Sequence, residues 1–427
     1  MKGIQYIGYD ILEEGDRTMG LNDTPSANRV HIGFFGRRNA GKSSLVNAVT
    51  GQQLAVVSDV MGTTTDPVMK SMELLPLGPV VIIDTPGIDD EGELGELRVK
   101  KTREILEKTD IAVLVVDVRQ REDEYEKNLI EEFVKREIPY IRVFNKCDLL
   151  GSDHEKPDFN NSDKKTMYVS STTGEGIEKL KECMARLLKA KEMTMQIVGD
   201  LLHPMDVVVL VIPIDASAPK GRLILPQQQV IRDILEAGAI SVVVKDTELK
   251  DTFDKLFHKP YMVITDSQAF GRVAEITPTD VYLTSFSILM ARWKGFLQAA
   301  LAGAHTLDDI HDGDRILIAE GCTHHRQCED IGTVKLPGWI RNYTGAEPEF
   351  TFTSGGEFPE DLSGYKLVIH CGGCMLNERA MRYRMNHTLS CKVPFTNYGT
   401  AIAKMNGILE RSVEVITDAW EKEDNLL

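Results

Sequence analysis

A glycine-rich segment near the start of the chain has the residue types and spacing that bind phosphate groups. Residues 36–43 read GRRNAGKS and match the pattern G-x-x-x-x-G-K-[ST]. The segment lies between an apolar run, VHIGFF, and a helix-like run, SSLVNAVTG, as the pattern requires. Backbone N–H groups can then surround the phosphates, and the Lys42 ammonium can reach their oxygens. We expect phosphate contacts from Gly36, Asn39, Ala40, Gly41, Lys42, Ser43 and Ser44.

Two further segments are placed to act on Mg²⁺ and on the terminal phosphate. Asp84 ends the apolar run PVVIID and begins the segment DTPG. Its carboxylate would lie near Mg²⁺, and the backbone N–H of Gly87 would face the γ-phosphate. The segment GTTTD at 62–66 lies where a switch loop supplies a threonine hydroxyl to Mg²⁺. The sequence therefore predicts a site for a nucleoside triphosphate with Mg²⁺.

Two segments at the ends of later apolar runs can recognise the base. NKCD at 145–148 offers a carboxylate that can accept two hydrogen bonds from guanine, whereas adenine presents no such pair of donors. The serine pair at 170–171 follows the run TMYV and fits the loop that closes over the base. These motifs, in this order, predict that the nucleotide is GTP or GDP. The expected contacts come from Asn145, Lys146, Asp148, Ser170 and Ser171.

Over residues 28–190 these motifs resemble the translation-factor-related GTPases of the TrmE–Era class. The resemblance implies that Thr64, with Thr63 as second choice, is the switch threonine next to Mg²⁺. Ile88 follows DTPG, so the glutamine that orients water in Ras-like enzymes is missing. Members that lack it often use K⁺ held by a P-loop asparagine, and Asn39 occupies that position; the alternative is that Asn39 only stabilises the loop. We expect slow, K⁺-stimulated hydrolysis, with Lys42, Thr64, Asp84 and Gly87 as catalytic residues and Ser43 and Thr64 as Mg²⁺ ligands.

A second group of reactive side chains lies in the last third of the chain. Cys322-Thr-His324 follows the run DRILIAEG, and His370-Cys371-Gly-Gly-Cys374 follows YKLVI. If these two expected strands are neighbours, three thiolates and one or two imidazoles converge at one edge of a sheet. Spacing alone leaves two interpretations open: a structural zinc site, which is the default, and an Fe–S cluster.

The other cysteines and histidines are interpreted as structural. A separate alternative makes the C-x-x-C segment a redox dithiol, but the distant third cysteine and the two nearby histidines favour a metal. The residues taken as core, exposed or inert side chains are His325, Cys328, His387, Cys391, Cys147 and Cys183.

Alternating apolar runs and amphipathic segments indicate an α/β protein of two or three domains. Residues 1–190 are expected to form a P-loop GTPase domain with a doubly wound sheet. Residues 191–267 carry no chemical motif and are expected to form a small α/β domain for packing or association. Residues 268–427 are expected to form an α/β domain that carries the cysteine and histidine motifs.

Charge and composition argue against several classes of function. The formal net charge is −16, which disfavours a broad nucleic-acid surface. No apolar run approaches the roughly 18 residues of a membrane span. Residues 1–29 lack the basic and apolar parts of a secretory signal, and seven cysteines in such a chain favour thiols or metal ligands over disulfides. We therefore expect a cytoplasmic protein without membrane or nucleic-acid partners.

The two motif groups together are more specific than either alone. A TrmE–Era-like domain followed by C-x-H and a distant H-C-x-x-C resembles HydF, the family of scaffold GTPases in FeFe-hydrogenase maturation. The resemblance implies a 4Fe–4S cluster on Cys322, Cys371 and Cys374, with His324 or His370 as an exchangeable fourth ligand. It also implies that the middle domain forms a homodimer.

The same resemblance implies a set of partners. The chain would receive a transient diiron precursor from two radical-SAM maturases and deliver it to apo FeFe-hydrogenase. The alternative is a regulatory GTPase of RNA modification or ribosome assembly with a structural zinc domain. The acidic charge balance and the lack of a basic stripe in the sequence disfavour that alternative.

Overall fold

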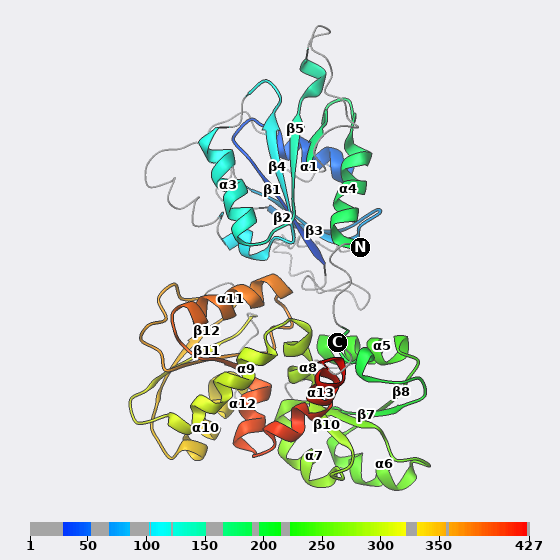
Figure 1. Ribbon diagram of the computed structural model, residues 1–427, viewed down its shortest axis with the longest axis vertical. Helices are drawn as coiled ribbons and strands as arrows, with labels where there is room; N and C mark the ends of the chain where they lie inside the picture. Colours follow the sequence, from blue (N-terminus) through cyan, green and yellow to red (C-terminus); the bar gives the residue numbers. More distant parts are fainter. Residues whose placement is uncertain are drawn as a thin grey trace, which may run out of the picture.

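The strands of the described residues form three sheets, each from a successive part of the chain (Figure 1). The protein is represented by a computed structural model, and the α/β class expected from the sequence is confirmed. Within the described part, no helix is long and apolar enough to cross a membrane. The structure describes residues 29–52, 68–85, 102, 104–120, 123–150, 165–189, 196–214, 223–321, 331–355 and 358–424.

The first sheet has the strand order β2-β3-β1-β4-β5-β6, in which β2 is antiparallel to β3 and the other neighbours are parallel. Its strands are β1 (Val30–Phe35), β2 (Val68–Leu74), β3 (Gly78–Asp84), β4 (Ile111–Asp117), β5 (Tyr140–Asn145) and β6 (Thr166–Tyr168). The helices include α1 (Lys42–Thr50), α3 (Glu124–Lys135) and α4 (Ile177–Lys189).

Both faces of this sheet are covered, because successive side chains of a strand point to opposite faces. Phe34 packs in one core with residues of α1 and α4, and Phe35 packs in the other with residues of α3. Each fully buried phenylalanine contributes about 1.5–3 kcal/mol to folding. The chain passes from β1 to β3 on one side and then to β4 on the other, so the sheet is doubly wound with its topological switch point at β1.

The second sheet is parallel and has the order β10-β9-β7-β8. The sequence predicted a domain boundary between residues 267 and 268. Because β10 pairs with β9, that boundary falls inside the sheet, and a boundary after β10 agrees better with the topology. The elements are β7 (Val207–Val211), α5 (Leu225–Glu236), β8 (Ile240–Val244), α6 (Leu249–Lys255), β9 (Met262–Thr265), α7 (Phe270–Ile276), β10 (Tyr282–Ser285) and α8 (Phe286–Trp293).

The third sheet is also parallel and has the order β12-β11-β13-β14. Its strands are β11 (Arg315–Ala319), β12 (Glu349–Thr353), β13 (Leu367–His370) and β14 (Phe395–Asn397). Its helices are α9 (Leu297–Ala304), α10 (Leu336–Thr344), α11 (Glu378–Ser390), α12 (Tyr398–Met405) and α13 (Leu409–Asp424).

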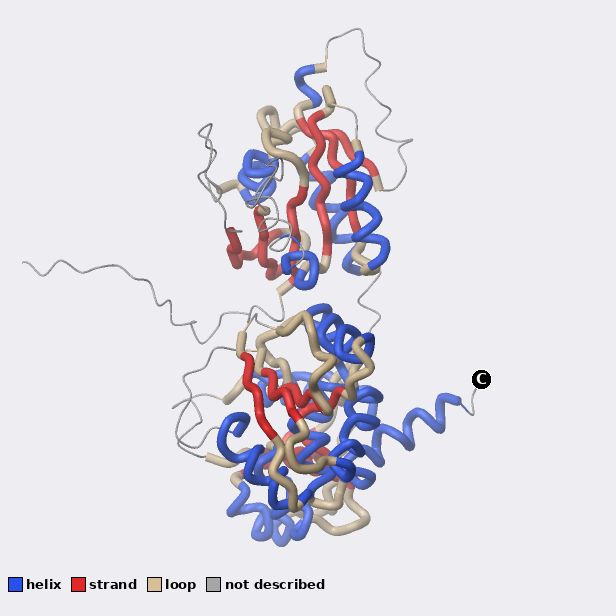
Figure 2. Tube along the Cα trace, turned by 90° about the vertical axis from the view of Figure 1, so that its left-hand side faces the viewer, coloured by secondary structure: helices blue, strands red, loops and turns tan. Residues whose placement is uncertain are grey.

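The second and third sheets share one hydrophobic core, which was not expected from the sequence. Buried residues of both sheets, such as Val209 and Ile318, belong to a single continuous cluster. The last helix returns to the second sheet, where α13 packs against β10 and Asp418 accepts a 2.8 Å hydrogen bond from the Tyr282 hydroxyl. Figure 2 shows the result: the first sheet forms one body, and the other two sheets form a second body together.

Candidate functional site

The phosphate loop connects β1 to α1, and two of its glycines have conformations that exclude a side chain. Gly36 has a φ of 142°, and a Cβ there would lie 2.2 Å from the carbonyl oxygen of Val115. Gly41 has a φ of 88°, and a Cβ there would lie 2.3 Å from Nδ2 of Asn145. Glycine is therefore required at both positions by backbone strain and by close approach.

Lys42 begins α1, and its ammonium holds the loop. Its Nζ donates hydrogen bonds to the carbonyl oxygens of Gly36 at 2.8 Å and Arg37 at 2.7 Å, and only 7% of the residue is exposed. The Arg37 side chain forms ion pairs with Asp123 and Glu126 at the start of α3. The loop is thus anchored to helices on both faces of the sheet.

The described residues at the predicted Mg²⁺ site fit that ion. Residue 84 ends β3 beside Phe34 of β1, and the Ser43 hydroxyl donates to Asp84 Oδ2 at 2.7 Å. Burial raises the pKa of Asp84, against the lowering effects of the Ser43 hydrogen bond and the Lys42 charge. The other carboxylate oxygen, Oδ1, is buried without a hydrogen-bond partner in the described part of the chain. Oxygen donors are the ligands that Mg²⁺ prefers. The predicted residues Thr64 and Gly87 lie outside the described residues.

Asn145 ends β5 and ties the guanine-recognition segment to the phosphate loop. The residue is fully buried, and its Nδ2 donates to the carbonyl oxygens of Ala40 at 3.3 Å and Gly41 at 3.4 Å. Its Oδ1 accepts the backbone N–H of Ser171 at 3.1 Å. One amide side chain therefore joins three of the predicted nucleotide segments.

The remaining base-recognition side chains lie on the same edge of the sheet. The Ser170 hydroxyl donates to Oδ1 of Asp148 at 2.6 Å. Lys146 has a left-handed backbone with a φ of 66°, and its Nζ donates to the Asn39 carbonyl at 2.6 Å. Asn39 is itself exposed, with a φ of 61°. These contacts bring together the described residues that the sequence predicted for binding guanine and K⁺. That they bind guanine and K⁺ remains a prediction.

Asp117 was missed in the sequence analysis. It ends β4 opposite Asn145 of β5 and forms ion pairs with Lys146 at 2.8 Å and Arg119 at 2.7 Å. These cations, the Arg119 hydrogen bond first, hold the pKa of Asp117 far below its usual range. The available signal was a carboxylate at the end of the apolar run IAVLVVD, in line with the other site residues. Asp117 orients Lys146 over the loop.

The cysteine motifs follow two neighbouring strands, as their predicted convergence requires. β11 pairs with β13, with Ala319 opposite His370. The chain goes from β11 to β12 on one side and then to β13 on the other, so the switch point of this sheet lies between β11 and β13. Ligand sites of open α/β sheets form at such crevices. Cys322 and His324 lie outside the described residues.

Backbone N–H groups point at one of the described sulfurs. Gly321, the residue before Cys322, donates to Sγ of Cys371 at 3.2 Å, and Gly373 donates to the same sulfur at 3.4 Å. Burial raises the pKa of Cys371 to about 11 and also raises the pKa of Cys374. A metal would remove these protons, because a coordinating thiol is deprotonated outright.

The donor set fits a thiolate-bound metal as far as it is described. N–H···S hydrogen bonds stabilise a thiolate, and softer metals and Fe–S clusters prefer sulfur. Among the described residues, no three His, Cys, Asp or Glu side chains are grouped closely enough to hold a metal ion. A complete site therefore depends on the segment that contains Cys322.

His370 supports the cysteine loop (residues 371–374) from below, whereas the resemblance had offered it, as an alternative to His324, as the exchangeable ligand. Its Nδ1 is 2.8 Å from the Cys371 carbonyl oxygen, and its Nε2 is 3.0 Å from a guanidinium nitrogen of Arg384. Burial, with the Arg384 charge, lowers the pKa of His370 to about 3, so the ring is neutral. Both ring nitrogens already have partners, and neither is free for a metal. Arg384, which the sequence analysis also missed, continues this network to the Gly355 carbonyl at 2.6 Å.

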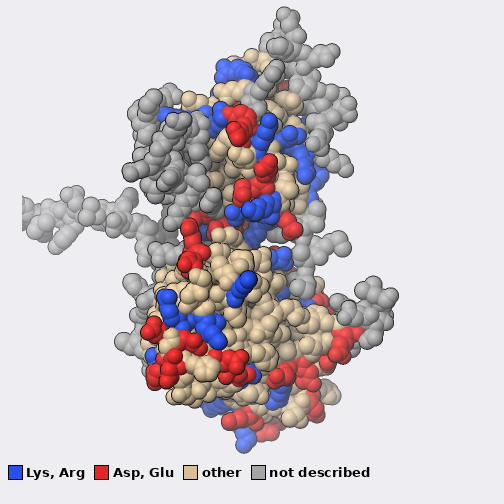
Figure 3. Space-filling model, turned by 60° about the vertical axis from the view of Figure 1, so that its left-hand side comes forward, with Lys and Arg blue, Asp and Glu red and all other residues tan. Residues whose placement is uncertain are grey.

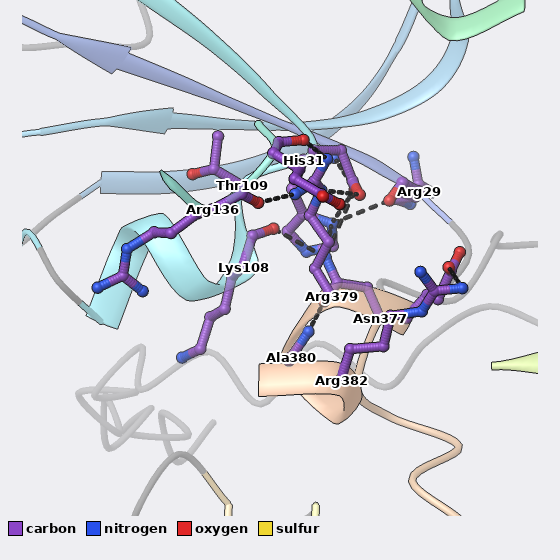
Figure 4. Close-up of polar contacts among 12 residues, drawn as sticks. Arg29, His31, Lys108, Thr109, Arg136, Asn377, Arg379, Ala380 and Arg382 are labelled. Carbon is purple, nitrogen blue, oxygen red and sulfur yellow. Dashed lines mark hydrogen bonds and ion pairs between the residues drawn. The ribbon is translucent and has the colours of Figure 1, made fainter. Parts of the chain in front are cut away.

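Helix α11 follows the cysteine loop, and its first residues contact the base of the GTPase sheet (Figure 4). Asn377 caps α11 by accepting the Ala380 N–H at 3.0 Å, and its Nδ2 donates to the Lys108 carbonyl at 2.7 Å. Arg379 donates to the backbone carbonyls of Arg136 at 3.1 Å and Glu137 at 2.8 Å. The helix that begins shortly after Cys374 is therefore bonded directly to the GTPase body.

Fold and site together define a P-loop GTP-binding protein with an appended two-sheet α/β body that carries a cysteine loop. Three family models match the chain. Residues 31–146 match a family described as a 50S ribosome-binding GTPase, residues 197–295 the hydrogen maturase F dimerization domain, and residues 298–415 the hydrogen maturase F tetramerization domain. The chain belongs to the hydrogen maturase F family, HydF, as its motifs indicated. The tetramerization match covers the part of the chain for which the sequence predicted cluster binding.

Curated relatives resemble only the GTPase part. The chain is 35% identical over 157 residues to "tRNA modification GTPase MnmE" of Legionella pneumophila, which is 36% of this chain and 33% of that protein. It is 34% identical over 172 residues to the protein of the same name from Nitrosomonas europaea, covering 40% and 37%. The chain thus spans about a third of the length of these relatives.

Solved structures match with low scores. The probable GTP-binding protein engB is 25% identical with a TM-score of 0.29, covering 38% of this chain and 99% of that one. A variant of Aquifex aeolicus Era bound to GDP and aluminium fluoride is 19% identical with a TM-score of 0.32, covering 53% and 97%. Scores at this level are too low to support a conclusion about function.

Proposed function

We propose that the chain is a GTP-hydrolysing scaffold that carries a 4Fe–4S cluster and passes a diiron precursor to apo FeFe-hydrogenase. One observation carries the cluster part of this proposal. In a chain of the HydF family, the residue before Cys322 donates a hydrogen bond to the sulfur of Cys371 at a sheet switch point. The diiron unit is cargo, supplied by two radical-SAM maturases.

The proposed cluster ligands are the thiolates of Cys322, Cys371 and Cys374. The fourth position is assigned to His324, because both ring nitrogens of His370 are engaged. A bound 4Fe–4S cluster supplies an iron with one exchangeable position, which another ligand can enter. The chain's own contribution is the N–H groups of Gly321 and Gly373, which favour the thiolate state.

GTP hydrolysis is assigned to residues of the first body. Lys42 would stabilise charge on the β and γ phosphates, and Ser43, Thr64 and Asp84 would hold or orient Mg²⁺. The backbone N–H of Gly87 would contact the γ-phosphate. With Ile88 after DTPG, we propose slow hydrolysis accelerated by K⁺ at Asn39. Equal turnover in matched KCl and NaCl would contradict the K⁺ assignment.

The second body also supports an oligomer, for which we propose a homodimer as the basic unit. The middle part of the chain matches a dimerization domain. β8 lies at the edge of its sheet and exposes Ile240 and Val243, by 39% and 46%. An exposed edge strand rich in β-branched residues is suited to pair with the same strand of a second copy. We also infer a cytoplasmic location from the sequence.

A regulatory GTPase of RNA modification is the second candidate, because the relatives reported above are named tRNA modification GTPases. That likeness is limited to the GTPase part. The net charge of −16 weighs against RNA binding, and Figure 3 shows acidic and basic side chains interspersed on one face of the second body. Under this candidate the cysteines would hold zinc.

Metal analysis distinguishes these candidates. The full-length protein is purified without oxygen, its iron, sulfide and zinc are measured, and the dithionite-reduced sample is examined by EPR. We expect iron and sulfide with a reduced 4Fe–4S signal that is lost in Cys371→Ser and Cys374→Ser. Cys391→Ser, in the same body but outside both motifs, is the matched control and should keep the signal. Stoichiometric zinc without iron would defeat the scaffold proposal and support the second candidate.

Transfer needs a separate assay. Protein loaded by the two maturases should activate apo FeFe-hydrogenase, and the two cysteine variants should not. Activation by loaded Cys371→Ser at the wild-type level would contradict the assigned role of the cluster site.

A further inference from the structure

A buried lysine supports the turn that contains Cys374. Lys294 follows α8, is only 2% exposed, and lies 79 residues before Gly373 in the sequence. Its ammonium donates a short hydrogen bond to the carbonyl oxygen of Gly373 and a 2.8 Å hydrogen bond to that of Leu376. The Leu376 N–H also donates to the Gly373 carbonyl, at 3.0 Å, and this closes a turn over residues 373–376. Lys294 therefore connects both ends of the turn in which Cys374 lies.

Burying an ammonium group is costly unless it is paired or fully hydrogen-bonded. Within the described residues, Lys294 has no carboxylate at ion-pair distance. Its hydrogen-bond partners are two neutral carbonyls, and its Nζ lies 6.0 Å from the centroid of the Trp293 ring. The negative groups that act on it electrostatically are the thiols of Cys374 and Cys371, when ionised, and Glu378. Burial disfavours the charged form and lowers the pKa of Lys294. Cysteines that bind a metal as thiolates would supply the anion that such a buried ammonium needs.

We propose that Lys294 is a positioning residue of the cysteine loop, which fixes the turn that carries Cys374 and places a positive charge beside the thiolates of Cys371 and Cys374. The charge part of this inference rests on the proposed cluster site, whereas the turn part stands without any metal. An oxidised 4Fe–4S core with three thiolates has a net negative charge, and reduction adds another electron. A nearby cation favours both states, and the reduced state more.

The same arrangement occurs in the phosphate loop of this chain. There the Lys42 ammonium, 7% exposed, donates to the carbonyls of Gly36 and Arg37. In both places a buried lysine draws loop carbonyls together and presents positive charge at a sheet switch point. The loop lysine of the nucleotide site follows its loop directly, whereas Lys294 comes from the helix that follows the second sheet.

Three substitutions separate the hydrogen bonds from the charge. Lys294→Arg keeps both, Lys294→Gln keeps a donor without charge, and Lys294→Met removes both at similar length. Lys366→Met, at an exposed position in the same body, is the matched control. Circular dichroism and thermal unfolding establish that each variant is folded. If Lys294→Met does not fold while Lys294→Gln does, the hydrogen-bond donor is required for the fold, and the comparison of Lys294→Gln with Lys294→Arg still decides the charge part.

The first readout uses protein without metal. Maleimide labelling of each cysteine in reduced apo-protein is followed by mass spectrometry of its peptide. Lys294→Met and Lys294→Gln both lack the charge that lowers the pKa of Cys374, and only Lys294→Met also lacks the donor. We expect Cys374 to be labelled several-fold faster in Lys294→Met than in Lys294→Gln, the factor expected for loss of one hydrogen bond of about 1 kcal/mol. Lys294→Arg and Lys366→Met should label like wild type, and Cys391 should not change in any variant. Equal Cys374 labelling in Lys294→Met and Lys294→Gln would overturn the turn assignment.

The second readout uses reconstituted protein. We expect iron release to a chelator to be faster in Lys294→Met and Lys294→Gln than in wild type. We also expect their cluster midpoint potential, from EPR-monitored titration, to be more negative. Unchanged potentials in both uncharged variants would overturn the charge assignment. Wild-type protein that binds no iron would defeat the proposed function instead, and the labelling readout would still decide the role of Lys294 in the turn.

Discussion

The nucleotide edge is the end of the first sheet that carries the phosphate loop, Asp84 and Asn145, and the cysteine edge is the end of the third sheet that carries Cys371 and Cys374. Both edges lie at topological switch points, yet they are supported in different ways. At the nucleotide edge, the side chains that the sequence predicts contact one another: Ser43 with Asp84, and Ser170 with Asp148. At the cysteine edge, the described sulfur contacts come from backbone N–H groups, and the supporting cation is Lys294. The first site is self-contained within one domain, and the second depends on its surroundings.

The two edges should therefore respond differently to changes elsewhere in the molecule. The cysteine loop is held from below by Lys294 and is followed by Asn377, which is bonded to the GTPase body through the Lys108 carbonyl. Lys108 ends the helical residues 104–108 of the GTPase body. A shift of these residues would therefore reach the start of α11 through Asn377. We expect the cysteine edge to respond to the GTPase body, and the nucleotide edge to be largely independent of the cysteines.

The largest expected effect tests the independence of the nucleotide edge. Lys42→Ala removes the ammonium that faces the phosphates and holds the Gly36 and Arg37 carbonyls. We expect GTP turnover to fall by at least about a hundredfold, as for loss of one electrostatic donor in an active site. Iron content of the purified variant should equal that of wild type, as measured by metal analysis. Loss of both GTP turnover and iron content in this variant would show that the nucleotide edge and the cysteine edge are not independent.

The nucleotide edge was predictable because its residues lie in short contiguous motifs at strand ends. Asp117 was not, because a single carboxylate after an apolar run has no motif around it, and its role depends on pairing with Lys146. Lys294 was not predictable either, since its partners are backbone atoms 79 and 82 residues away. The short strand YLTS of β10 gave too little periodicity to place it in the second sheet, so the boundary was set too early.

The next effect tests whether His370 supports the loop or binds metal. His370→Leu removes the acceptor for the buried guanidinium of Arg384 and the ring's contact with the Cys371 carbonyl. We expect unfolding free energy to fall by about 1–3 kcal/mol, as for a buried polar group left without its partner. Urea unfolding measures this loss, and iron content should stay at the wild-type level. Iron loss equal to that of Cys371→Ser would show that His370 binds the metal and does not only support the loop.

A smaller effect concerns the contact between the two bodies. Arg379→Gln removes the hydrogen bonds to the carbonyls of Arg136 and Glu137 and the ion pair with Asp110 at 3.6 Å. We expect faster hydrogen exchange in residues 104–110 with basal GTP turnover unchanged, because the contact lies at the end of the sheet away from the nucleotide. Lys366→Gln is the matched control, since it removes a positive charge at an exposed position in the same body.

That exchange experiment also tests the connection between the edges. If GTP and GDP give different EPR spectra of the cluster in wild type, the difference should shrink in Arg379→Gln and persist in the control. A GTP-dependent spectral difference that persists fully in Arg379→Gln would show that the two edges are connected through residues other than Arg379.

The smallest expected effect is a pH dependence of the same contact. Tyr383 of α11 is hydrogen-bonded to Glu107 of the GTPase body, and burial, reinforced by that carboxyl, raises the pKa of Tyr383 to about 12. The folded pKa is above the ordinary tyrosine value of 10.0, so the contribution to stability is fully present below about pH 10 and is lost as pH rises toward about 12. Tyr383 is partly exposed, so solvent screening keeps the effect small.

Tyr383→Phe removes the titrating hydroxyl without removing the ring. Unfolding free energy measured from about pH 8 to about pH 11 should fall more steeply in wild type than in Tyr383→Phe, because only wild type binds the proton more tightly when folded. Parallel curves would mean that Tyr383 titrates alike in the folded and unfolded chains and would remove it from the contact. A steeper fall in wild type would locate one pH-sensitive group at the boundary between the self-contained nucleotide body and the body whose cysteine loop depends on its neighbours.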